Sequence, residues 1–258
     1  MTPISRNVSN WMDEVFQTLE TLRLNVVHEC DFAAPENDIE EETVHEFFRR
    51  ALPTYWLKPS MSSLRKLSLY SSLPWGFYPK VNMEGIHFPN LESLTLGFFS
   101  FADDKHIDWI LEHSSTLKEL YMDRCFIVFY VQIQDDDDIL ERTPLITSDM
   151  TCDPEESDKL IYHYPRRWHE YFTSIQNGLP NLSCFGFGTS PLWEQNKMPF
   201  ETKWNLANKL TEERYSPFLG QFIWYPFHLS STVEWPNCDQ QDLDALKALY
   251  QAIGQGTN

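Results

Sequence analysis

The sequence has no long apolar run, no paired cysteines and no familiar catalytic motif, and each absence excludes a class of protein. No apolar stretch approaches the roughly 20 residues of a membrane-spanning helix, and residues 1–10 lack the apolar stretch of a signal peptide. The five cysteines are scattered and form no Cys-x-x-Cys pair, which favours a reducing compartment. We therefore expect an intracellular protein of the cytoplasm or nucleus that does not enter a membrane.

Motifs for catalysis and cofactor binding are also missing. There is no Gly-x-Ser-x-Gly, no phosphate-binding loop and no His-Glu-x-x-His, and residues 186–191 begin like a dinucleotide loop but carry Pro at the third Gly position. We expect no catalytic residues and no cofactor. The alternative is a hydrolase-like or other enzyme whose site is built on inserted segments; a deep pocket joining His163, His169 and Asp158 would favour it.

Two groups of side chains resemble metal ligands only superficially. Residues 135–138 are four consecutive aspartates, but a calcium-binding EF-hand needs alternating acids, a Gly and a terminal Glu. His28, Cys30 and Asp31 match no zinc spacing and no second cluster accompanies them. We therefore expect no metal site.

Negative charge is concentrated in two stretches. The chain has 38 Asp and Glu against 20 Lys and Arg. Residues 29–42 hold seven acids without a base, and residues 134–158 hold ten acids and one Arg. We expect two acidic insertions that loop out into solvent; they could also recruit basic partners. We expect no nucleic-acid binding, because these acidic stretches would repel phosphate backbones.

The most informative pattern present is Leu-x-x-Leu-x-Leu, which occurs five times when Met or Phe is allowed at the later positions. The copies begin at Leu19, Leu64, Leu91, Leu117 and Leu182. Leu64 and Leu91 are 27 residues apart, and Leu91 and Leu117 are 26 apart, within the roughly 20 to 29 residues of a leucine-rich repeat. The two wider gaps contain the acidic insertions.

Flanking residues separate these copies from chance matches in helices. Ser or Pro-Asn precedes the first Leu in three copies, and such residues stop a helix and open a strand. In the fourth copy Cys125 occupies the Asn/Cys position that turns inward after the strand. The sequence therefore predicts an α/β fold: a single leucine-rich-repeat solenoid over residues 1–258, with parallel strands on its concave face and helices on its convex face. The strands are expected near 19–25, 64–70, 91–97, 117–123 and 182–188.

Other segments complete this prediction. Residues 126–131 and 160–164 are expected to pair as a hairpin. The aromatic stretch 215–227 is expected to be buried in the core, and the alternative is an exposed hot spot for binding. Residues 239–254 are expected to form a C-terminal capping helix. Further helices are expected at 42–52, 103–113 and 166–179.

A solenoid of this kind binds partners along its concave face, to which the residues between the inward leucines point. Three rows are predicted across the strands. They are Thr21-Lys66-Ser93-Glu119-Cys184, Arg23-Ser68-Thr95-Tyr121-Gly186 and Asn25-Tyr70-Gly97-Asp123-Gly188. Because aromatic and charged side chains anchor and orient partners, the candidate binding residues are Arg23, Lys66, Tyr70, Glu119, Tyr121 and Asp123.

Residues 88–96, 108–120, 166–168 and 238–253 make the chain resemble the C-terminal repeat region of fungal F-box leucine-rich-repeat proteins. The resemblance implies a non-catalytic protein-interaction role, namely substrate recognition in a ubiquitin-ligase adaptor, with an unidentified protein as partner. The first repeat begins by Leu19, which leaves no room for an F-box. We therefore expect either a truncated gene model, which alone would add the ligase's adaptor subunit as a partner, or a stand-alone binding domain.

Overall fold

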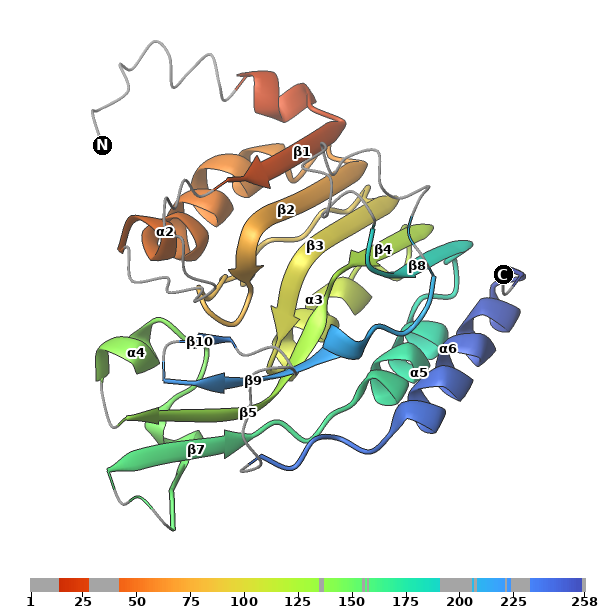
Figure 1. Cartoon of the computed structure of the whole chain (residues 1–258). Helices are drawn as coiled ribbons and strands as arrows, with labels where there is room; N and C mark the ends of the chain where they lie inside the picture. The colour runs from red at the N-terminus through yellow and green to blue at the C-terminus, as the bar shows by residue number, and fades with distance from the viewer. Residues whose placement is uncertain are drawn as a thin grey trace.

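The computed structural model describes residues 14–27, 42–134, 137–154, 156, 158–190, 206, 208–220, 222–223 and 233–256. Figure 1 shows a row of side-by-side strands that continues into a second group of strands, with helices packed beside it. Within the described residues, no helix combines the length and the apolar character needed to cross a membrane.

Five parallel strands form the first part of the sheet. They lie in the order β1 (Thr21–Val26), β2 (Lys66–Trp75), β3 (Ser93–Phe101), β4 (Glu119–Asp123) and β8 (Cys184–Gly188). Their register aligns the apolar row Leu22-Leu67-Leu94-Leu120-Phe185. The predicted strand positions and the three predicted polar rows are confirmed, because a side-chain repeat of two fixes the register once one face is buried.

A repeated turn sets this register. The carbonyls of Glu20, Arg65, Glu92 and Lys118 each accept two backbone N–H groups at the start of the next strand. The amide of Asn90 also donates to the Ser62 carbonyl at 2.8 Å. The Pro-Asn and Ser signals before the leucines therefore open strands, as predicted, and bind each unit to the preceding one.

The prediction of a leucine-rich-repeat solenoid is wrong for the fold as a whole. The sheet forks at β3, whose first residues pair with β4 while Ser100 and Phe101 pair with β5 (Phe126–Gln134). The β5 branch is mixed. Strand β5 pairs in parallel with β9 (Tyr215–Leu219) and antiparallel with β7 (Lys159–His163). On the outer sides, β7 pairs antiparallel with β6 (Thr151–Cys152), and β9 pairs antiparallel with β10 (Phe222–Ile223).

Helices do not accompany the strands one by one either. Residues 76–92, between β2 and β3, contain no helix. The Leu-x-x-Leu-x-Leu pattern specifies only about five residues per unit, and the apolar runs that follow it, such as residues 98–101 and 126–131, extend the sheet instead of turning into a helix.

The second acidic stretch is part of the folded structure, contrary to the expectation of a solvated loop. Residues 134–158 include α4 (Asp137–Glu141), the short helix η3 (Thr147–Asp149) and β6. Their apolar residues Ile139, Leu140, Leu145 and Met150 are buried in a second core under the β5 branch. The hairpin of residues 126–131 and 160–164 is confirmed as the β5–β7 pair. Residues 28–41, the bulk of the first acidic stretch, lie outside the described residues.

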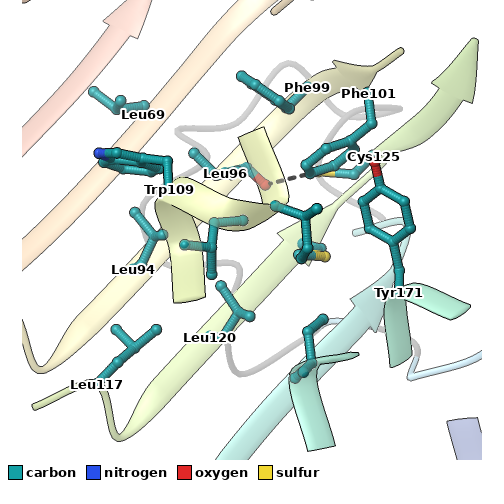
Figure 2. Packing of buried hydrophobic residues seen from close by; sticks show 14 of the residues in the cluster. Leu69, Leu94, Leu96, Phe99, Phe101, Trp109, Leu117, Leu120, Cys125 and Tyr171 are labelled. Atoms are coloured by element: carbon teal, nitrogen blue, oxygen red, sulfur yellow. Dashed lines mark hydrogen bonds between the residues drawn. The ribbon is translucent and has the colours of Figure 1, made fainter. Parts of the chain in front are cut away.

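The main core lies between the parallel strands and the helices. Figure 2 shows leucines of neighbouring strands around Trp109 of α3 (Asp104–Leu111), and Tyr171 of α5 (Trp168–Gly178) beside Phe101. The buried thiol of Cys125 donates to the Leu96 carbonyl at 3.3 Å, which is the inward turn predicted for it. Before β2 lie α2 (Glu42–Glu46), the π-helical run η1 (Phe47–Leu57) and η2 (Lys58–Ser60).

The C-terminal helix α6 (Asp239–Ala252) packs against α5, and it follows η6 (Glu212–Arg214) and the β9 branch in the chain. After it, the side-chain amide of Gln255 accepts from Phe185 N at 2.9 Å and donates to Phe185 O at 2.8 Å. This pair of bonds replaces a further strand at the edge of the parallel sheet. In the aromatic stretch, Tyr215 and Phe218 are core, as predicted; residues 224–227 lie outside the described residues.

Candidate functional site

The three polar rows lie on the opposite side of the parallel strands from the leucines. Exposure falls along these rows from the edge of the sheet inward. Thr21, Arg23 and Lys66 on β1 and β2 are exposed, whereas Ser93 and Thr95 on β3 are buried. The candidate surface is therefore the open end of the rows.

A shallow hollow of about 20 Å³ lies at this open end. It is lined by Thr21, Arg23, Lys66, Ser68, Tyr70, Ser93 and Thr95. We call the side chains of Thr21, Arg23, Lys66, Ser68, Ser93, Thr95 and the adjacent Glu119 the polar strand face. Sequence reasoning placed all of them on one face but selected only Arg23, Lys66 and Glu119, because hydroxyl residues carry no distinctive signal on a strand.

Several donors of the polar strand face have no partner within the described part of the chain. The side chains of Thr21, Arg23, Lys66, Ser68 and Thr95 form no hydrogen bond or ion pair there. In contrast, the neighbouring cations Arg65 and Lys118 both pair with Glu92, Lys118 at 3.4 Å. Ser93 donates to Glu119 Oε2 at 2.8 Å. The open donors are therefore concentrated on β1, β2 and Thr95 of β3.

The other three predicted site residues are buried. Tyr70, Tyr121 and Asp123 are at most 4% exposed. Tyr70 donates to Asp123 Oδ2 at 3.3 Å, and Ser190 N donates to Asp123 Oδ1 at 2.8 Å. Burial, with a hydrogen bond to Cys184, raises the pKa of Tyr121. The structure brings these three residues to the same rows but leaves them little surface to offer a partner.

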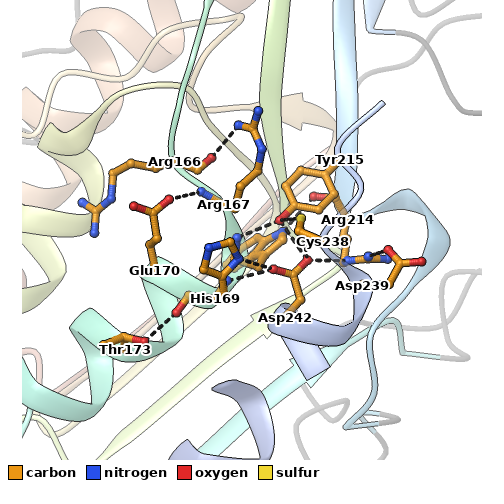
Figure 3. A network of polar contacts seen from close by, with 11 residues as sticks. Arg166, Arg167, His169, Glu170, Thr173, Arg214, Tyr215, Cys238, Asp239 and Asp242 are labelled. Carbon is orange, nitrogen blue, oxygen red and sulfur yellow. Dashed lines mark hydrogen bonds and ion pairs between the residues drawn. The ribbon is translucent and has the colours of Figure 1, made fainter. Parts of the chain in front are cut away.

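A second polar cluster ties α5, α6 and β9 together, as Figure 3 shows. Its centre is the fully buried carboxylate of Asp242. Asp242 accepts from His169 N at 2.9 Å, from Arg214 Nε at 3.1 Å and from the Tyr215 hydroxyl at 2.9 Å. His169 Nδ1 lies 3.0 Å from Asp242 Oδ1. The cluster fixes the C-terminal helix against the sheet.

His169, Cys238 and Asp242 also lie close enough together to be considered as metal ligands. Their chemistry does not fit a metal site, since the guanidinium of Arg214 already forms an ion pair with the carboxylate of Asp242. Burial raises the pKa of the Cys238 thiol, which disfavours the thiolate that both metal binding and nucleophilic catalysis require. The Cys238 thiol lies near Tyr215 and Asp242, at 3.4 and 3.5 Å. We interpret the cluster as structural.

A larger hollow of about 620 Å³ lies beside α3 and was not predicted from the sequence. His106 and Trp109 lie on its inner side, and burial lowers the pKa of His106. Lys80 at its edge donates to the Thr143 carbonyl at 3.1 Å, and burial lowers the pKa of that lysine. The rim mixes Lys80 and Lys105 with Glu84, Asp103, Asp108 and Glu112. Because positive and negative side chains both line the rim, the hollow does not indicate a particular class of ligand.

The residues named for the enzymatic alternative do not share a site in the described structure. His163 is exposed on β7 and contacts Tyr130, His169 belongs to the Asp242 cluster, and Asp158 is exposed in a turn. None of the three lines a hollow described above. Residues 28–31 and the side chains of residues 135–138, which were considered as metal ligands, lie outside the described residues.

Comparisons with models of known protein families, with curated proteins and with solved structures found no match for this chain.

Proposed function

We propose that this chain is a non-catalytic protein-interaction domain that binds a partner protein across the polar strand face. The observation that carries the proposal is the group of unpartnered donors on three adjacent strands. The nearby cations Arg65 and Lys118 are both engaged by Glu92 and are therefore less available to another protein. Arg23 and Lys66 lie on the same sheet without such a partner in the described ranges.

The geometry favours an extended segment of the partner. Parallel strands hold their side chains in rows about 4.8 Å apart across the sheet and about 6.6 Å apart along each strand, so the face offers a regular grid. Arg23 on β1 and Lys66 on β2 place positive charge at one end, and Glu119 places negative charge on β4. Such a charge gradient fixes the orientation of a partner more than it adds affinity.

A charge-reversal experiment tests this proposal. The variant Arg23→Glu/Lys66→Glu should lose a specific partner from cell extract, while the matched control Lys58→Glu/Lys247→Glu, which changes the same charge at exposed positions elsewhere, should retain it. The partner would then be purified and its Kd measured against both variants. Equal affinity for both variants would reject the polar strand face as the binding site. Asp123 is unsuitable for reversal because it is buried.

The narrower role, substrate recognition within an F-box-type ubiquitin-ligase adaptor, depends only on the resemblance described above, and we propose it on that basis. It predicts that the complete gene product co-purifies with the adaptor subunit of the ligase and promotes ubiquitylation of the captured partner. Failure of both would reject this role and leave the binding proposal untouched.

We further propose an intracellular location, in the cytoplasm or the nucleus. Cys125, Cys152, Cys184 and Cys238 are free cysteines, and free thiols are typical of reducing compartments. Microscopy of the tagged chain, together with alkylation of Cys152 in intact cells, tests this location; secretion of the chain would contradict it.

A further inference from the structure

The hollow in the polar strand face has the composition of an oxyanion site. The side chains without partners in the described part of the chain are two cations, Arg23 and Lys66, and three hydroxyls, Thr21, Ser68 and Thr95. All five can donate hydrogen bonds, and none carries negative charge. Of the remaining lining residues, Ser93 already donates to Glu119 and Tyr70 to Asp123.

The positions of these donors let the long side chains of Arg23 and Lys66, with the hydroxyls nearest them, converge on one small group. Thr21 pairs in register with Lys66, and Arg23 with Ser68, which in turn pairs with Thr95. Three adjacent strands therefore supply donors within about 10 Å across the sheet and about 7 Å along it. Thr95 is the deepest donor: the residue is only 4% exposed, and it lines the hollow without a hydrogen-bond partner among the described residues. The Thr95 hydroxyl is not one of the fully buried polar atoms that lack a partner in the described chain, so it still reaches solvent in the hollow and can donate to a bound group.

Charge and valence favour a phosphate group over a carboxylate. A phosphorylated side chain carries about two negative charges and three acceptor oxygens at neutral pH. Two cations match that charge, and the hydroxyls and the branched donors of Arg23 can serve three oxygens, whereas a carboxylate offers one charge and two oxygens. A nucleic-acid backbone is disfavoured, because its row of phosphates needs many matched cations, whereas the hollow offers two and the chain as a whole carries a net charge of −18.

We propose that this hollow binds the phosphate group of a phosphorylated serine or threonine in an extended segment of the partner. The inference rests on the proposed function, since it names the group by which the partner is anchored on the polar strand face. The guanidinium of Arg23 and the ammonium of Lys66 contact the phosphate from the exposed strands, and the hydroxyl of Thr95 donates from below.

Titration of the full chain with small probes tests the site. The probes are the N-acetyl amide of phosphoserine, the N-acetyl amide of aspartate, inorganic phosphate and a single-stranded oligonucleotide, each followed by NMR shifts of backbone amides. We expect saturable shifts at Arg23, Lys66, Ser68 and Thr95 with the phosphoserine probe. The aspartate probe should bind at least about tenfold more weakly, since it forms fewer charge-assisted bonds.

Neutral variants sharpen the test. Arg23→Gln/Lys66→Gln should weaken phosphoserine binding by at least about tenfold, while the matched Lys58→Gln/Lys247→Gln should leave it unchanged. Thr95→Val keeps the size of the side chain and should weaken the binding of phosphoserine and of inorganic phosphate alike. Shifts outside these strands, equal binding by the two double variants, equal affinity for aspartate, or preference for the oligonucleotide would each overturn the inference.

Failure of the inference can be separated from failure of the proposed function. A partner whose binding depends on Arg23 and Lys66 but survives phosphatase treatment unchanged would overturn the phosphate site and keep the binding face. A partner that binds both charge-reversal variants equally would overturn both.

Discussion

Tyr70 lies over Gly97: a Cβ atom placed on Gly97 would come within 2.1 Å of the Tyr70 ring atom Cδ1. The two residues are register partners on β2 and β3, and the missing side chain lets the ring cross β3 to reach Asp123 on β4. Tyr121 and Gly186 repeat the arrangement one step along the sheet, where a Cβ on Gly186 would lie 2.8 Å from Tyr121 Cδ1. These pairs close the inner part of the polar rows.

Gly97→Ala should therefore destabilise the protein by about 1–3 kcal/mol, because the added methyl group overlaps the Tyr70 ring and displaces it from Asp123. Urea unfolding measures the loss. In a Tyr70→Ala background the same change should cost much less, since the ring is gone. An equal cost in both backgrounds would show that Tyr70 and Gly97 do not interact.

Leu94→Ala should cost about 2–5 kcal/mol, because Leu94 is 0% exposed and lies at the centre of the apolar row of the parallel strands. Val15→Ala, at a position that is 59% exposed, should change the free energy of unfolding by less than about 0.5 kcal/mol. Similar small effects of both changes would contradict the buried position of the row.

Stability should fall with acidification through His113. Burial, helped by the nearby His87, lowers the pKa of His113 to about 4. Its Nε2 accepts from Phe88 N at 3.2 Å, and its Nδ1 lies 2.9 Å from the Trp109 carbonyl, a geometry that suits the neutral ring. In the unfolded chain the imidazole binds a proton below its ordinary pKa of about 6.5. The stabilisation is therefore full above about pH 6.5 and is lost as the pH falls toward 4.

The pH dependence can be measured by urea unfolding at about pH 7 and about pH 4.5. Over this interval the wild type should lose about 2–3 kcal/mol more than His113→Gln, whose side chain does not titrate. Identical losses in the two proteins would show that His113 is not responsible.

Gln255→Ala should loosen the edge of the parallel sheet. The change removes both side-chain bonds to Phe185, and each net hydrogen bond contributes about 1 kcal/mol. Exchange of the Phe185 amide hydrogen should accelerate by about tenfold as local opening becomes easier. Gln251→Ala, an exposed change on α6, is the control. Unchanged exchange at Phe185 would indicate that the amide of Gln255 does not protect the edge.

Sequence reasoning succeeded where a short local pattern determines the structure. The leucine spacing gave the five parallel strands and their register, and the apolar residues near Leu246 and Leu249 with Gly254 gave the C-terminal helix. It failed where distant segments meet. The branch that leaves β3 gains β9 as a neighbour of β5, with Ile127 paired to Tyr215, and no local pattern encodes a contact over that separation.

The candidate site shows the same division. Register placed the six predicted residues in the right rows, but register does not report burial. Tyr70 and Tyr121 are buried because glycines lie opposite them and, for Tyr121, because Leu206 packs close by. Donors without a partner, such as Thr95, could not be predicted from the sequence, because the absence of a partner depends on the three-dimensional contacts.

Chemical footprinting of the polar strand face tests the central claim most directly. A cysteine at Ser68→Cys and, separately, one at Lys58→Cys would be introduced into a Cys30→Ser/Cys152→Ser background, and alkylation rates would be measured with and without the captured partner. Binding across the polar strand face predicts that saturating partner slows alkylation at position 68 by at least about tenfold and leaves position 58 unchanged. Protection of position 58, or equal rates at position 68 in the two conditions, would contradict it.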